Sequence, residues 1–293
     1  MNNHDVLLEV KNLEISYAKN HWWSDKLKTE RAVNKVSLTL HAGETLGLLG
    51  ESGCGKSSLA RAIVGLVPAT SGQLFYRGLD YTSLQPQMMR PLRAKIQMIF
   101  QDPSGSLNPR QSVRTLLDRP LALHQPGLNS RERRFACITM LERVGLHEGA
   151  LERFPHDFSG GQRQRLAIAR ALLLKPELIV CDEVVSALDV SVQSQVLNLL
   201  LELQEDFGLS YLFISHDISV VRHISDRIVI MQKGSLVEEC QASDILLRHQ
   251  HTYTRTLIHA APSLDLLVAS PSHSFPSTPS RHQEITRCHA ALV

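Results

Sequence analysis

Several features are scarce in this sequence of 293 residues, and each scarcity excludes a class of protein. No run of 18 consecutive apolar residues occurs, so the sequence predicts no membrane-spanning helix. The first ten residues, MNNHDVLLEV, lack the basic-then-apolar order of a secretory signal, which favours a cytosolic chain. The net charge is only +2, so composition predicts no basic face for coating nucleic acid.

Cysteines and aromatic residues are also few. The sequence predicts free, reduced thiols rather than disulfides or a zinc site, because the five cysteines form no CxxC pair: Cys54, Cys137, Cys181, Cys240 and Cys288. Aromatic residues make up 5% of the chain, and its two tryptophans are adjacent, at Trp22 and Trp23. We expect this pair to pack on the protein rather than to contact a partner or a membrane.

Apolar residues, 43% of the chain, follow patterns typical of both strands and helices. They alternate in the short runs 8–10, 13–15 and 36–40, which predicts an N-terminal β layer of short strands. Residues 18–31 have no clean period and are expected to form a loop.

Continuous apolar strands, separated by helices, are predicted farther along the chain. Residues 45–49, 178–181 and 211–214 are typical of buried strands, and 192–203 has the apolar spacing of a helix. Alternating strands and helices indicate a mostly parallel sheet, and residues 227–238 add a further strand or hairpin. The predicted fold class is therefore α/β.

The middle and the end of the chain differ from this core. Residues 103–175 are expected to form an inserted helical subdomain, with one helix that Ser130 caps and Gly145 ends, and a second after Ser159. Residues 263–293 are rich in Ser, Pro and His and are expected to be a flexible tail.

The segment Gly50–Ser57, GESGCGKS, matches GxxxxGK[ST] between a predicted strand and a predicted helix. Glycines allow backbone N–H groups to surround phosphate oxygens, and the helix N-terminus adds positive partial charge. The pattern predicts that Lys56 binds the β- and γ-phosphates of a nucleotide and that Ser57 ligates Mg²⁺.

Two adjacent acids, Asp182 and Glu183, end the predicted strand 178–181. Successive side chains on a strand point to opposite faces, so Asp182 is expected to face the Mg²⁺ while Glu183 acts as general base on water. Taken alone, the pair could equally be solvated acids at a strand end, but the phosphate loop favours the catalytic interpretation.

The string Ser159–Gln162 within PHDFSGGQRQR resembles the signature motif of the ATP-binding cassette (ABC) family, which combines it with a P-loop in this order. The resemblance covers about residues 5–262, which would form the ABC ATP-binding domain with the P-loop NTPase core. Other strings resemble the family's remaining motifs: Gln101 in MIFQDP, Ser186–Asp189, His216 in FISHD and the aromatic Tyr17.

The resemblance implies ATP and Mg²⁺ as cofactors and a site shared between two facing cassettes. The implied catalytic residues are Glu183, His216, Gln101 and Lys56, and the implied metal ligands are Ser57, Gln101 and Asp182. The implied nucleotide-binding residues are Tyr17, Gly50, Glu51, Ser52, Gly53, Cys54, Gly55, Lys56, Ser57, Ser58, Ser159, Gly160, Gly161, Gln162 and Asp189.

Longer strings, such as FQDPSGSLNPR and HTYTR, look like those of dipeptide, oligopeptide and nickel importers. That branch implies an ATPase on the cytoplasmic face of the inner membrane, with two permease subunits, a second cassette and an extracytoplasmic solute-binding protein, and no nucleic acid.

Two positions depart from the family pattern, because Val184 and Thr252 stand where proline is usual. The alternatives are a soluble ABC ATPase of DNA repair or ribosomes and a cassette that binds nucleotide without turnover. The solute, and whether the second cassette is a copy or a homologue, stay open.

Overall fold

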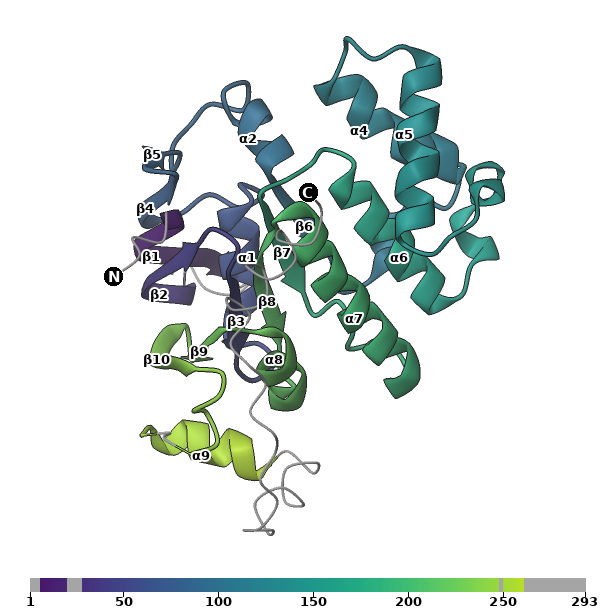
Figure 1. Ribbon diagram of the computed structural model, residues 1–293. Coiled ribbons are helices and arrows are strands. Elements are labelled where there is room, and N and C mark those ends of the chain that lie inside the picture. The colour runs from purple at the N-terminus through teal and green to yellow at the C-terminus, as the bar shows by residue number, and fades with distance from the viewer. Residues whose placement is uncertain (1–5, 20–27, 248–249, 261–293) are drawn as a thin grey trace, which may run out of the picture.

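The computed structural model describes residues 6–19, 28–247 and 250–260, which form two sheets with helices on both sides of the larger one (Figure 1). This arrangement confirms the predicted α/β class with a P-loop NTPase core, an N-terminal β layer and an inserted helical segment. The tryptophan pair, Cys288 and the predicted tail lie outside the described residues.

The smaller sheet is antiparallel, with the strand order β2-β1-β4-β5. Its strands are β1 (Val6–Lys19), β2 (Lys28–His41), β4 (Ser71–Tyr76) and β5 (Leu79–Asp80). The prediction of short strands was wrong, because β1 and β2 have 14 residues each and extend into the expected loop 18–31. Register shifts along β1, as at Val10/Leu13, interrupt the alternation, so that one long strand resembles several short ones in sequence.

The larger sheet has six strands in the order β10-β9-β3-β8-β7-β6, and only the β9–β10 pair is antiparallel. Its strands are β3 (Thr45–Leu49), β6 (Ile96–Ile99), β7 (Leu178–Asp182), β8 (Ser210–Ser215), β9 (Arg227–Gln232) and β10 (Ser235–Gln241). The central strands β3, β7 and β8 are buried throughout, as continuous apolar runs predict. Their carboxyl ends therefore meet at one edge, where open α/β sheets bind ligands.

Helices complete the core on both faces of this sheet. The apolar residues of α1 (Lys56–Ile63) share a cluster with the smaller sheet, so α1 lies between the two sheets. On the other face, α7 (Val190–Phe207) and α8 (Ile218–Ile224) belong to a second cluster (Figure 1). The last helix among the described residues is α9 (Thr252–His259).

The helical insert follows β6 and precedes β7, and it packs on the second cluster. It contains α3 (Pro103–Ser106), α4 (Val113–His124), α5 (Ser130–Arg143), two 3-10 turns (Glu148–Glu152, Pro155–Asp157) and α6 (Gly160–Leu172); α2 (Met89–Lys95) precedes β6. The predicted cap of α5 was wrong by one residue. Asn129, not Ser130, accepts the backbone N–H bonds, because Glu132 completes a capping box with it.

Among the described residues, none of the helices has the length and hydropathy needed to cross a bilayer. The described cysteines are free thiols, as predicted: Cys54, Cys137, Cys181 and Cys240. Burial raises the pKa of Cys181 far above that of an ordinary thiol, so it packs as an apolar group.

Candidate active site

The loop between β3 and α1 requires glycine at two close approaches. A Cβ on Gly50 would lie 2.3 Å from the carbonyl oxygen of Met231, and one on Gly55 would lie 2.1 Å from that of Ala32. Gly55 also has a φ of 113°, which only glycine adopts readily. Gly55 caps α1 without a side-chain hydrogen bond, so the N-terminus of α1 is open to an anion.

Lys56 lies inside this loop and is only 4% exposed. Its ammonium donates to the carbonyl oxygens of Gly50 (2.7 Å) and Glu51 (2.8 Å). The ammonium has three N–H donors, and the remaining contact, to Cys54 Sγ at 3.9 Å, is weak. Burial raises the pKa of Cys54, so its thiol stays neutral beside the lysine.

Ser57 and Asp182 meet at the carboxyl edge of the larger sheet. The Ser57 hydroxyl donates to Asp182 Oδ1 at 3.0 Å, and Asp182 is 4% exposed. Burial raises the pKa of Asp182, while the Ser57 hydrogen bond acts in the opposite direction. Both groups are hard oxygen ligands, which Mg²⁺ prefers. Within the described residues, no group of three or more His, Cys, Asp or Glu side chains could hold a metal ion.

Glu183 follows the last residue of β7, and its side-chain partners differ from those of Asp182. Its carboxylate accepts a hydrogen bond from Gln101 Nε2 at 2.9 Å through Oε2, and its Oε1 lies 3.4 Å from His216 Nδ1. Glu183 has a φ of 50°, a backbone conformation that is strained for a residue other than glycine. Strain of this kind is held in place by the surrounding structure, here by a hydrogen bond from Glu183 N–H to the Ile214 carbonyl.

Tyr17 reaches the same loop from β1. Its hydroxyl donates to Ser58 Oγ at 3.2 Å, although the residue is 40% exposed. The phosphate loop therefore has an exposed aromatic ring beside the first turn of α1.

The signature residues Ser159–Gln162 form the N-terminus of α6. Ser159 caps α6 and forms a reciprocal capping box with Gln162, and its carbonyl accepts from the Arg163 N–H. Asp189, at the start of α7, is exposed, and the following Val190 is 80% exposed. The structure thus brings Lys56, Ser57, Gln101, Asp182, Glu183 and His216 together, and it leaves Ser159–Gln162 and Asp189 facing solvent.

Sequence reasoning missed several residues of this site. Arg61, Phe100 and Asp102 join Ser57, Gln101 and Asp182 around a cavity of about 320 Å³. The spacing of Ser57 and Arg61, four apart on a helix, could have indicated that they share a face. Tyr253, from α9, accepts a hydrogen bond from the Glu51 N–H at 3.1 Å, and no local pattern indicates this contact.

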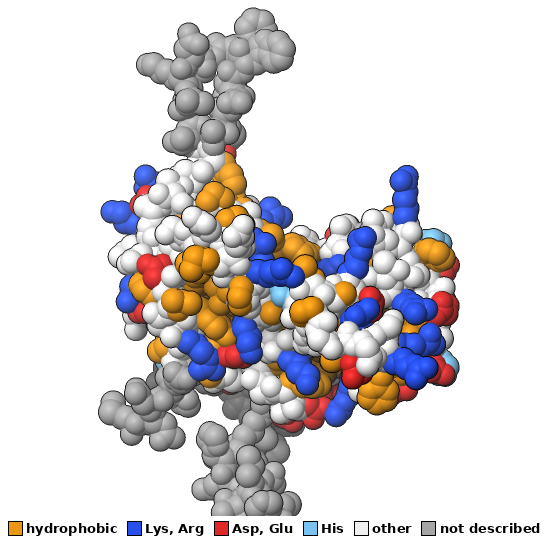
Figure 2. All heavy atoms as spheres, turned by 90° about the horizontal axis from the view of Figure 1, so that it is seen from above, with side chains coloured by type: hydrophobic (Ala, Val, Ile, Leu, Met, Phe, Trp, Pro, Cys, Tyr) orange, Lys and Arg blue, Asp and Glu red, His pale blue; other side chains and the backbone are white. Residues whose placement is uncertain are grey.

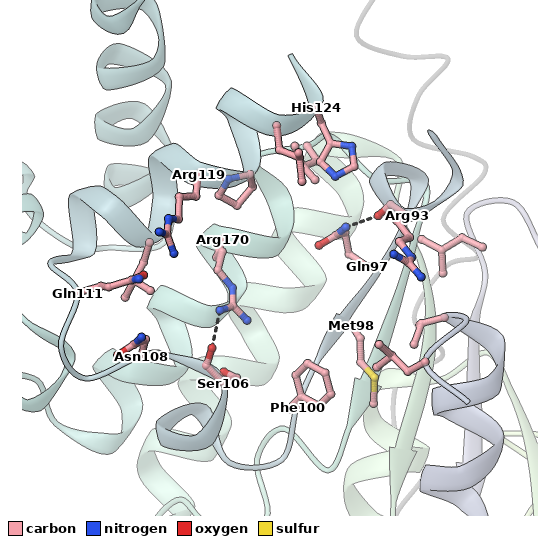
Figure 3. Close-up of a pocket in the computed structure, with 17 residues that line it drawn as sticks. Arg93, Gln97, Met98, Phe100, Ser106, Asn108, Gln111, Arg119, His124 and Arg170 are labelled. Carbon is pink, nitrogen blue, oxygen red and sulfur yellow. Dashed lines mark hydrogen bonds between the residues drawn. The ribbon is translucent and has the colours of Figure 1, made fainter. Parts of the chain in front are cut away.

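A larger cavity, of about 620 Å³, opens between the core and the helical insert. Figure 3 shows Arg93, Gln97 and Phe100 on the core side, and Arg119, His124 and Arg170 on the side of the insert. Arg170 donates to the Ser106 carbonyl at 2.6 Å, and burial lowers its pKa, although a guanidinium stays charged. Burial also lowers the pKa of His124, which favours its neutral form. We refer to this cavity as the insert groove.

The fold and the phosphate loop at the sheet edge define the class of P-loop nucleotide hydrolases. The family model of the ABC transporter matches residues 33–186. The chain is 48% identical to the oligopeptide transport ATP-binding protein OppF of Escherichia coli (strain K12), over 89% of this chain and 79% of that protein. It is 47% identical to the dipeptide transport ATP-binding protein DppF of the same strain, over 80% and 70%.

A solved structure resembles this chain closely. The dimeric, post-hydrolysis structure of the ATP-binding cassette MJ0796, bound to ADP and Pi, has a TM-score of 0.72 at 28% identity and covers 80% of this chain and 99% of that chain. The chain belongs to the ABC transporter family and is an ATPase.

Proposed function

We propose that this chain is the ATP-binding subunit of an importer and hydrolyses Mg²⁺-ATP to drive uptake of a di- or oligopeptide. The relatives named for oligopeptide and dipeptide transport support the peptide class. A nickel or other metal chelate remains the alternative solute. The observation that carries the ATPase mechanism is the position of Glu183 between Gln101 and His216, next to the phosphate loop.

Each residue of the site has a distinct proposed role. The loop 50–58 binds the phosphates, Lys56 offers its weakly engaged N–H to the γ-phosphate, and Tyr17 stacks on the base. Ser57, Asp182 and Gln101 would hold Mg²⁺, which neutralises charge on the phosphates. Glu183 takes the proton of the attacking water, while Gln101 and His216 orient its carboxylate.

A second cassette is proposed to complete the site. Ser159 at the N-terminus of α6 and Asp189 are exposed, and the resemblance implies that they lie far from the phosphate loop of their own chain. The N–H donors at the start of α6 would contact the γ-phosphate held by the partner cassette, and Asp189 would connect the two sites, as the resemblance implies. The dimeric form of the MJ0796 cassette supports this arrangement.

The insert groove is the proposed docking site for a membrane permease subunit, two of which would complete the pathway. Figure 2 shows hydrophobic side chains gathered on this face with Lys and Arg side chains around them, and Leu66, Met88 and Leu123 are each more than half exposed. The groove contains half-buried Arg170, which favours an acidic or carbonyl-rich segment. Docking in the insert groove would place the chain on the cytoplasmic face of the membrane. Residues 5–262 would form the cassette domain that docks.

Co-purification and reconstitution test the proposal. The full chain, expressed with the membrane subunits encoded beside it, is expected to purify with them, and peptide-loaded binding protein should stimulate ATP hydrolysis in liposomes. The Leu123→Glu variant tests the role of the groove, because Leu123 lines it. Its matched control is Phe135→Glu, because Phe135 is 71% exposed and does not line the groove. Association with ribosomes or DNA instead, or stimulation by a nickel chelate but not by peptides, would overturn the corresponding part of the proposal.

A further inference from the structure

A hydrogen bond links the C-terminal helix α9 to the phosphate loop. Tyr253 is 7% exposed, and its hydroxyl oxygen accepts from the backbone N–H of Glu51 at 3.1 Å. This N–H belongs to the same peptide group as the carbonyl of Gly50, which accepts from the ammonium of Lys56 at 2.7 Å. Because a peptide group is planar, fixing its N–H also fixes the direction of its carbonyl.

The tyrosine is itself held firmly. Glu238 of β10 accepts hydrogen bonds from the backbone N–H groups of Gln250 and His251 and from the hydroxyl of buried Thr254. These bonds tie the start of α9 to the β9–β10 hairpin, beside which α9 lies in Figure 1. The same hairpin supports the phosphate loop, since Gly234 N–H donates to the Cys54 carbonyl at 2.9 Å.

We propose that Tyr253 is a positioning residue for ATP binding, which orients the Gly50–Glu51 peptide group and through it the ammonium of Lys56. The proposal rests on the proposed phosphate-binding role of Lys56. When the Glu51 N–H donates to the Tyr253 hydroxyl oxygen, the peptide group is polarised and its carbonyl becomes a stronger acceptor. Without the hydroxyl, this peptide group can rotate, and Lys56 loses one of the two carbonyls that direct it to the phosphates.

The Tyr253→Phe variant of the full chain keeps the ring and removes only the hydroxyl. We expect its Kd and KM for Mg²⁺-ATP to rise about two- to tenfold, the worth of one neutral hydrogen bond. Its kcat should change little, because Lys56 contacts the phosphates before and during the reaction. A fluorescent ATP analogue gives the Kd, and phosphate release gives kcat and KM.

A matched control is Tyr81→Phe. The Tyr81 hydroxyl donates to the Ile63 carbonyl at 2.9 Å, at the far end of the helix that follows the phosphate loop. This variant is expected to lower the melting temperature and leave the Kd for ATP unchanged. If Tyr253→Phe lowers the melting temperature as Tyr81→Phe does and leaves the Kd unchanged, the tyrosine is merely structural and the proposal is wrong.

A double-mutant cycle tests whether Tyr253 acts through Lys56. Lys56→Ala alone should weaken ATP binding, and adding Tyr253→Phe should then have little further effect. Additive effects on the Kd would refute the route through Lys56. An unchanged Kd in Lys56→Ala would instead refute the proposed role of Lys56, so the two failures are distinguishable.

Discussion

Replacing Glu183 with glutamine removes the proposed base and leaves the shape of the side chain almost unchanged. The glutamine carbonyl can still accept from Gln101, which lies 2.9 Å from one carboxylate oxygen. The other carboxylate oxygen, which lies 3.4 Å from His216 Nδ1, is replaced by the amide NH₂ group, which cannot take a proton from water. The variant should therefore bind ATP normally and lose only the proton transfer. General-base catalysis contributes about 10²- to 10⁴-fold, or about 2.7 to 5.4 kcal/mol of activation free energy.

The assay is steady-state phosphate release, with the Kd for ATP measured in parallel on the same preparation. Glu202→Gln makes the same chemical change at an exposed residue of α7 and should keep full activity. A Glu183→Gln variant that hydrolyses ATP within threefold of the unmodified chain would remove Glu183 from the role of base. A variant that loses ATP binding would show instead that the carboxylate holds the site together.

Three other substitutions test separate parts of the structure. Asp182→Asn should raise the Mg²⁺ concentration needed for half-maximal hydrolysis by at least about tenfold, since one charged ligand is lost; an unchanged Mg²⁺ titration would contradict this. Gly161→Ala places a Cβ 2.4 Å from Val192 Cγ1, so overpacking should lower stability by about 1–3 kcal/mol in denaturant unfolding, and Val192→Ala should restore it. Thr252→Pro should leave stability unchanged or raise it by up to about 1 kcal/mol, because Thr252 is the first residue of α9 and His251 before it is extended. A lower melting temperature in Thr252→Pro would refute the prediction that proline is compatible with this position.

The central sheet and the phosphate loop were predictable because their signals are local. A buried parallel strand is a continuous apolar run, and glycines at fixed spacing mark the loop that follows β3. The strand β7 ends at Asp182, and Glu183 follows with a φ of 50°, so the pleat of the strand does not set the direction of the Glu183 side chain. Asp182 contacts Ser57, which is 125 residues away in sequence, and Glu183 contacts Gln101, which is 82 residues away. The predicted strand ends indicate that these residues lie at the same edge of the sheet, but not which of them are in contact.

Other features depend on tertiary packing that leaves no local pattern. The bulges of β1 hide its length, and the short strand β6 has too few residues to show a period. The cap of α5 falls on Asn129 because two good capping residues are adjacent and geometry selects between them. Tyr253 is 202 residues from Glu51, so only the position of α9 indicates its contact with the phosphate loop.

One segment connects the insert groove with the hydrolysis site. Phe100 and Ser106 line both the groove and the cavity around Asp182, and Gln101 lies between them in sequence. Gln101 in turn donates to the proposed base, Glu183. A permease segment that entered the groove would displace Phe100 or Ser106, and with them the amide that orients Glu183. We therefore infer that hydrolysis would depend on docking, because Gln101 donates one of the hydrogen bonds that orient the Glu183 carboxylate.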